Sequence, residues 1–286
     1  MNQKNYLITR RPKDNFLKNH IAYYYFHVSN YEEHSEAFYF YPNYMHALTI
    51  YKGNDVEIDL DGKSSKVRTS ADTDKLTFLY CINLKDKIHV DLQGTYHKIG
   101  IVFYPLGINH FIDKPLNEFL SNSFQKLIMD TIFEEHIRTL KKEQPLEEQV
   151  EILESALIAV MRPFENKVLQ RAVREIILSN GTIKVDALEA ITFTARKTLL
   201  RLFKKHLYAT IEDYKKMVMF RNSINYALQH QEMLNLTDIA LYSMYYDQSH
   251  FIRHFKSITE ETPKTLLPKI VQIGNEDLYW HFIDEK

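Results

Sequence analysis

Residues 245–255 read YYDQSHFIRHF and contain the clearest structural pattern in the C-terminal half of the chain. At 100° per residue, Phe251 and Phe255 share one face of a helix, while Arg253 lies on the opposite face. Asp247 stands where a side-chain cap would begin that helix. The stretch therefore predicts a short helix that is anchored by two phenylalanines and presents polar and basic side chains to solvent.

The same pattern occurs a second time, displaced by 52 residues. The matched positions are Leu199, Arg201, Phe203, Lys204 and Thr210, which recur as Phe251, Arg253, Phe255, Lys256 and Thr262. In each copy, a preceding short helix is expected to begin at an aspartate cap, Asp186 or Asp238. Two copies of one supersecondary unit are therefore predicted.

The second helix of each copy combines a buried face with a polar one. The buried faces consist of Leu199, Phe203 and His206 in the first copy and of Phe251, Phe255 and Ile258 in the second. The opposite faces consist of Lys197, Arg201 and Lys204, and of Ser249, Arg253 and Lys256. Such a pair of helices is typical of a helix-turn-helix unit, whose second helix lies in the DNA major groove, where Arg pairs with guanine and Gln with adenine. Residues 212–229 predict a connecting helix about 27 Å long, near the 34 Å repeat of successive major grooves.

The charge distribution agrees with this interpretation. The 286 residues carry a formal net charge of -1, and 45% are hydrophobic, which is ordinary for a globular chain long enough for two domains. Residues 165–270 nevertheless contain 16 Lys and Arg against 11 Asp and Glu. A local excess of +5 is compatible with a nucleic-acid-binding module, although a solvated surface alone can also carry it.

The first hundred residues have a different character. Short aromatic and β-branched segments, separated by turn residues such as Gly53, Gly62 and Gly94, predict an antiparallel sandwich or barrel. The predicted strands cover residues 21–28, 37–41, 45–51, 55–60, 75–82, 87–92 and 97–104. After Pro105 the apolar spacing becomes helical, and residues 115–142 and 146–162 predict amphipathic helices.

The fold class expected from these patterns is α+β. Arg162-Pro163 marks the boundary between the two halves, because the residue before proline is disfavoured in a helix. We therefore expect a β-rich regulatory domain at residues 1–164 with helices from about residue 115, an all-α DNA-binding domain at 165–270, and a C-terminal tail at 271–286.

Enzymatic and metal-dependent functions find little support. Cys81 is the single cysteine and lies in an apolar strand, so we expect neither a disulfide nor a multi-cysteine site, and a reducing, cytoplasmic compartment. The histidines at positions 27, 34, 46, 89, 97 and 110 lack the spacing of a metal-binding barrel. No glycine-rich phosphate loop or membrane-spanning apolar run is present. We predict no catalytic residue, no metal and no cofactor.

At this point a family resemblance becomes visible. Residues 238–263, DIALYSMYYDQSHFIRHFKSITEETP, resemble the signature of AraC/XylS-type transcriptional regulators, and the resemblance extends over about residues 165–268. It implies a cytoplasmic bacterial protein with a DNA-binding domain of two helix-turn-helix units joined by a long helix. Residues 102–119, VFYPLGINHFIDKPLNEF, resemble the end of the variable sensor domain in a subgroup of these regulators.

The resemblance also assigns roles to residues. The base-reading positions would be Lys197, Leu200 and Arg201 in the first unit and Gln248, Ser249, His250 and Arg253 in the second, with phosphate contacts from Lys204, Lys205 and Lys256. Leu200 is apolar and Ala195 cannot cap its helix, so we hypothesise that the second unit carries most of the base specificity.

Three positions depart from the family pattern. Tyr208, Met244 and Glu260 stand where the family has glycine, and a positive φ at each would cost about 1 kcal/mol or more. Two interpretations follow: the turns differ, or the domain is less stable. A degenerate regulator that acts through protein contacts with weak or no DNA binding is the alternative function.

The expected partner is double-stranded DNA, and no membrane is expected. RNA polymerase, a small-molecule effector and a second copy of the chain are left open as further partners. The aromatic residues between Tyr23 and Tyr44 would pack in a core or line an effector pocket, so the ligand-binding residues stay unknown.

Overall fold

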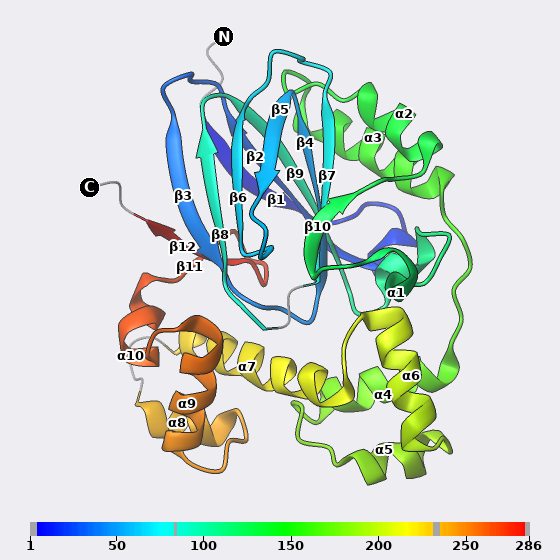
Figure 1. Cartoon of the computed structure of the whole chain (residues 1–286), viewed down its shortest axis with the longest axis vertical. Helices are drawn as coiled ribbons and strands as arrows, with labels where there is room; N and C mark the ends of the chain where they lie inside the picture. The colour runs from blue at the N-terminus through cyan, green and yellow to red at the C-terminus, as the bar shows by residue number, and fades with distance from the viewer. Residues whose placement is uncertain (1–4, 83–84, 231–234, 284–286) are drawn as a thin grey trace.

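Two six-stranded sheets pack face to face in the upper part of the molecule, and a row of helices lies below them (Figure 1). The computed structural model describes residues 5–82, 85–230 and 235–283. Its mixture of a β sandwich and a separate helical region confirms the predicted α+β class.

The first sheet is antiparallel throughout. Its strands, in spatial order, are β1 (Tyr6–Arg10), β2 (Ile21–Ser29), β9 (Tyr96–Phe103), β4 (His46–Lys52), β7 (Leu76–Cys81) and β10 (Phe124–Leu127). The second sheet contains β11 (Val271–Gln272), β12 (Tyr279–Ile283), β3 (Ser35–Phe40), β8 (Ile88–Gln93), β6 (Ser64–Thr69) and β5 (Asn54–Ile58). Only the β6–β8 pairing is parallel among these strands.

The first sheet is buried on both faces, which explains the unbroken aromatic run in β2. Tyr24 and Phe26 face the helices α2 (Thr131–Arg138) and α3 (Leu146–Ala159), whereas Tyr23 and Tyr25 face the second sheet. Alternate residues of a strand point to opposite faces, so a strand with two covered faces favours apolar side chains on both, as in the run from Tyr23 to Phe26. Every residue of β2 is buried.

The predicted helix over residues 115–142 is wrong in its continuity. The segment forms α1 (Leu116–Phe119), the edge strand β10 and then α2, because β10 completes the first sheet beside β7. The helix predicted over 146–162 is confirmed as α3.

The helical region follows an extended connection. It contains α4 (Lys167–Leu178), α5 (Val185–Thr192), α6 (Arg196–Leu207), α7 (Ile211–Gln229), α8 (Leu236–Tyr242), α9 (Gln248–Thr259) and α10 (Pro263–Leu266). Helix α7 runs horizontally in Figure 1 and separates α4–α6 from α8–α10. The predicted connecting helix is therefore confirmed.

The described part of the predicted C-terminal tail, residues 271–283, belongs to the β sandwich. Residues 271–283 form a hairpin that extends the second sheet, with β12 paired to β3. Trp280 is buried between the sheets and stacks on Phe38, with the ring centroids 4.1 Å apart. The chain therefore returns to its N-terminal domain after the last helix.

Candidate nucleic-acid interface

The 52-residue repeat of the sequence is also a repeat of the backbone. Helices α6 and α9 each have 12 residues and are displaced by 52 at both ends. Each ends at a residue in the left-handed region, Tyr208 with φ 51° and Glu260 with φ 65°. Thr210 and Thr262 then cap the next helix, each accepting a hydrogen bond from the backbone N–H three residues later. In the two copies, the second helix therefore begins, ends and leads into the next helix at equivalent positions.

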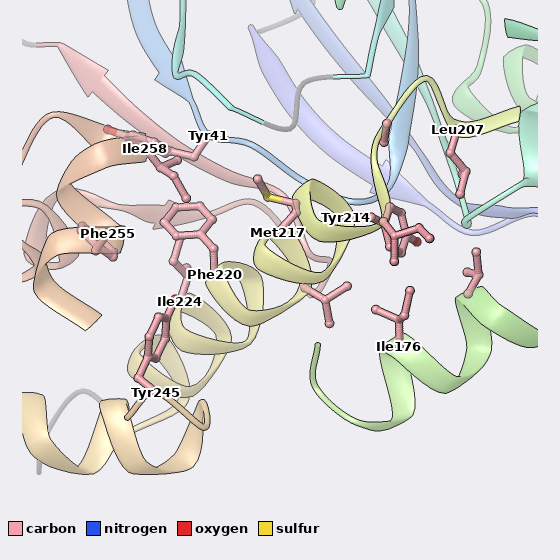
Figure 2. Close-up of a cluster of buried hydrophobic side chains, with 14 of the residues drawn as sticks. Tyr41, Ile176, Leu207, Tyr214, Met217, Phe220, Ile224, Tyr245, Phe255 and Ile258 are labelled. Carbon is pink, nitrogen blue, oxygen red and sulfur yellow. The ribbon is translucent and has the colours of Figure 1, made fainter. Parts of the chain in front are cut away.

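Both helices are anchored on α7 by their predicted aromatic residues. Phe203 packs on Tyr214 with ring centroids 5.8 Å apart, and Phe255 packs on Phe220 at 5.6 Å. Figure 2 shows Tyr214 and Phe220 along α7, with Phe255 beside Phe220 and Ile176 near Tyr214. Because α7 carries both anchors, it fixes the separation of α6 and α9.

His206 is the exception on the predicted buried faces. It is half-buried and turns toward the N-terminal domain, where its Nδ1 lies 3.2 Å from Asn109 Oδ1 and its ring packs on Phe164. Burial lowers the pKa of His206 to about 4, so the ring is neutral at pH 7 and adds no charge to α6.

The proposed reading residues lie on the solvent side of the two helices. Lys197, Arg201, Lys204, Gln248, Ser249, His250, Arg253 and Lys256 are exposed, and Lys205 is partly exposed. Leu200 is half-buried and packs against the helical core, which limits what it can offer to a base.

The cations on these faces have no acidic partner. Lys197, Arg201, Lys204, Lys205, Arg253 and Lys256 form no ion pair with any residue that the structure describes, whereas Lys167, Lys215 and Lys269 of the helical region do. Paired surface charges are partly neutralised, and unpaired ones keep their attraction for an external anion such as a phosphate.

The beginnings of the helices correct two predictions and confirm two others. Asp186 and Asp238 lie inside α5 and α8, whose caps are Lys184 and Asn235. The Asn235 side chain caps α8 by accepting from the Asp238 N–H at 2.8 Å. An amide oxygen caps as well as a carboxylate. The sequence pattern placed the start of α5 two residues too late and that of α8 three residues too late.

Asp247 caps α9 as predicted, because its Oδ1 accepts from the His250 N–H at 2.6 Å. Ala195 occupies the N-cap position of α6 and provides no side-chain hydrogen bond, also as predicted. Glu189 in α5 compensates, since its Oε1 accepts from the Arg196 N–H at 2.6 Å. A first-turn N–H group of α9 is therefore bound by the N-cap residue Asp247, and one of α6 by Glu189 of the preceding helix.

All three positions that lack the expected glycine have positive φ: Tyr208, Met244 (61°) and Glu260. The turns therefore keep their geometry, and the first of the two interpretations is wrong. Two of the three side chains are held by the N-terminal domain. Tyr208 donates to the Ser121 carbonyl at 3.1 Å, and Glu260 pairs with Lys87 at 2.8 Å.

One exposed candidate was missed in the sequence. The 52-residue displacement that pairs Arg201 with Arg253 also pairs Arg196 with Gln248. Arg196 is exposed in the first turn of α6 and forms no ion pair with a described residue. The 52-residue repeat, applied to every position of the second helix, also identifies Arg196 as a candidate.

Among the described residues, no group of three or more His, Cys, Asp or Glu side chains is placed to hold a metal ion. No helix in that part of the chain is both long and apolar enough to cross a membrane.

Comparison with known proteins identifies the helical region. The helix-turn-helix domain family of the AraC type matches residues 188–268. No curated protein matches the chain. Two solved structures of ToxT from Vibrio cholerae share 10% and 11% identity, each cover 85% of this chain and 97% and 96% of their own, and have TM-scores of 0.47 and 0.46.

A third solved structure, the xylose-binding transcription activator xylR, shares 21% identity over 37% of this chain and 28% of its own, with a TM-score of 0.32. All three TM-scores are below 0.5, so the assignment rests on the domain match. The chain therefore carries an AraC-type helix-turn-helix domain at residues 188–268.

Proposed function

We propose that this protein is a DNA-binding transcription regulator that reads two successive major grooves of one DNA duplex, with α6 in one groove and α9 in the next. The observation that carries the proposal is the matched pair of helices, which repeat at 52 residues and present cations without ion-pair partners among the described residues. Helix α7, with 19 residues, is about 28 Å long, close to the 34 Å between successive major grooves.

Arg201 and Arg253 are the central readers, because an exposed Arg in the groove bonds both acceptors of a guanine. Lys197, Gln248, Ser249 and His250 flank them, and Arg196 joins this set through its match to Gln248. Lys204, Lys205 and Lys256 contact phosphates. The half-buried Leu200 supports the hypothesis that α9 carries more of the base specificity than α6.

The remaining partners follow from the family. An effector, RNA polymerase and a second copy of the chain are the proposed partners of a regulator of this type, and binding to chromosomal DNA requires the cytoplasm. The second candidate function is that of a degenerate regulator that acts through protein contacts, with weak or no DNA binding. Phe193 and Tyr246, 89% and 91% exposed in or beside the two turns, favour it.

The test compares Arg201→Ala with Arg253→Ala on an operator found by genomic footprinting. Each is expected to lower specific affinity by about 1–3 kcal/mol, with the larger loss of sequence discrimination for Arg253→Ala. Arg171→Ala is the matched control, an exposed arginine of α4 outside both helices. If the wild-type chain showed no salt-dependent DNA affinity, the protein-contact function would replace this proposal.

A further inference from the structure

A cavity lies between the two sheets of the N-terminal domain, and three parts of the chain line it. Its volume is about 80 Å³. Both sheets contribute aromatic side chains, the C-terminal hairpin contributes residues 277–280, and α7 contributes Arg221. The linker helix of the DNA-binding half therefore reaches the wall of a cavity in the other half.

Lys98 is the unusual residue of this cavity. It is 3% exposed in β9, and its Nζ lies 4.5 Å from the Phe38 ring centroid and 4.6 Å from that of Trp280. No described residue forms an ion pair with it, and Glu36 lies against His27 instead, at 3.1 Å. Aromatic faces offset part of the cost of burying an ammonium group, but they do not neutralise it.

The same burial is visible in the proton affinity of Lys98. Desolvation lowers its pKa to about 7, and the charge of Glu36 only partly opposes this shift. The ammonium form of Lys98 at pH 7 therefore lacks a counter-ion among the described residues.

Ser65 supplies a second polar group. It is 1% exposed, lines the cavity from β6, and its Oγ has no hydrogen-bond partner within the described structure. A buried hydroxyl without a partner destabilises the protein, and a ligand that accepts its hydrogen bond would relieve this cost. Lys98 and Ser65 thus both present donors to a cavity whose other walls are mainly apolar.

The size of the cavity limits the ligand. It is about half of the 150 Å³ engineered cavity that holds benzene, which has six heavy atoms. A ligand of about three to five heavy atoms fits. An inorganic anion would leave the aromatic walls without an apolar partner, whereas a short carboxylic acid matches both the donors and the walls.

We propose that this cavity is a binding site for a short-chain monocarboxylate, with the carboxylate held by Lys98 and Ser65 and the alkyl group packed against Phe38 and Trp280. Its role as the effector site of the regulator rests on the proposed function. Binding is measured without DNA, so failure of the site and failure of DNA recognition are separate results.

The experiment uses propionate with the full chain and reads the fluorescence of Trp280, the single tryptophan of the sequence, together with the thermal midpoint. Propionate should change both readouts saturably at constant ionic strength, and propionamide, its neutral isostere, should change neither. Equal responses to propionate and propionamide would overturn the proposal.

Variants locate the site. Lys98→Met should weaken propionate binding at least tenfold and raise the thermal midpoint of the unliganded protein, since it removes an uncompensated buried charge. Ser65→Ala keeps the lysine and should weaken binding by about tenfold, as expected for one hydrogen bond to a charged group. Lys66→Met, an exposed lysine on the same strand as Ser65, should bind propionate like the wild type. Wild-type affinity in both Lys98→Met and Ser65→Ala would contradict the assignment.

Discussion

Arg221 of the linker helix α7 and Asp277 of the C-terminal hairpin form an ion pair in the interior of the protein. Arg221 is 1% exposed, and its NH2 group also donates to the Asp277 carbonyl at 3.0 Å. The same carbonyl accepts from the Tyr23 hydroxyl at 3.1 Å. One residue of the hairpin therefore joins the linker helix to the β sandwich.

Breaking this pair should destabilise the protein strongly. Asp277→Ala leaves the Arg221 charge buried without its partner, and the free energy of unfolding should fall by about 3 kcal/mol. Arg221→Met should cost less than Asp277→Ala, because methionine removes the charge and fills part of the volume. The free energies come from urea unfolding. The control is Lys63→Ala, which removes an exposed ion pair with Asp86 and should change stability by less than about 0.5 kcal/mol. A neutral Asp277→Ala would show that the pair does not hold the hairpin.

The hairpin itself should be part of the cooperative fold. Trp280→Ala removes the stack on Phe38 and leaves a cavity between the sheets, which should cost about 3–5 kcal/mol. Val271→Ala, at an exposed position of β11, should change stability by less than about 0.5 kcal/mol. Thermal unfolding followed by far-ultraviolet circular dichroism measures both, and a Trp280→Ala variant as stable as Val271→Ala would contradict this role of the hairpin.

Glycine should stabilise the second turn. Met244 has φ 61° and is 57% exposed, so Met244→Gly removes backbone strain without removing a core side chain. The left-handed strain outweighs the extra chain entropy of glycine, and we expect a gain of about 0.5–1 kcal/mol. Leu241→Gly, exposed within α8, is the matched control and should instead lose about 1 kcal/mol. Destabilisation of both variants in urea would contradict the left-handed backbone conformation of Met244.

Acid should unfold the N-terminal domain through its buried histidines. Burial lowers the pKa of His46 to about 3 and those of His27 and His97 to about 4. Each ring binds a proton in the unfolded state near pH 6.5 but not in the folded state, so stability is present above pH 6.5 and is lost as the pH falls toward 4.

Each histidine contributes a slope of up to about 1.4 kcal/mol per pH unit in this window. His46→Phe should remove one such contribution between pH 6 and pH 4.5, although it leaves the Tyr80 hydroxyl without its 2.8 Å partner. His230→Phe, at an exposed position of the helical region, should keep the wild-type slope. Identical slopes in the wild type and His46→Phe would exclude His46 as a source of the pH dependence.

The sequence predicted the helical half better than the sandwich, for identifiable reasons. The start and end of α6 and α9 follow from a local pattern of apolar residues, and the displacement from Phe203 to Phe255 provides a second, independent reading of it. The two aspartate caps were misplaced because an asparagine and a lysine, each lying before the expected cap, also permit a helix start.

Strand pairing over long distances could not be read in the same way. β10 lies in a segment with helical spacing, and only its position beside β7 makes it a strand. β12 pairs with β3, whose partner residues lie 240 to 246 positions earlier, and no local signal distinguishes it from a tail. For the same reason the aromatic residues of the sandwich could be predicted from the sequence, whereas the cavity could not, because its wall includes Trp280 from the far end of the chain.

The spacing of the two DNA half-sites tests whether α6 and α9 read one duplex at the same time. Since Tyr214 and Phe220 fix α6 and α9 on one rigid helix, the two grooves must lie on the same side of the duplex. Insertion of 5 base pairs between the half-sites rotates one groove by about half a helical turn and should weaken binding at least tenfold at constant salt, measured by fluorescence anisotropy. Equal affinity for the original and the lengthened operator would contradict simultaneous reading by the two helices.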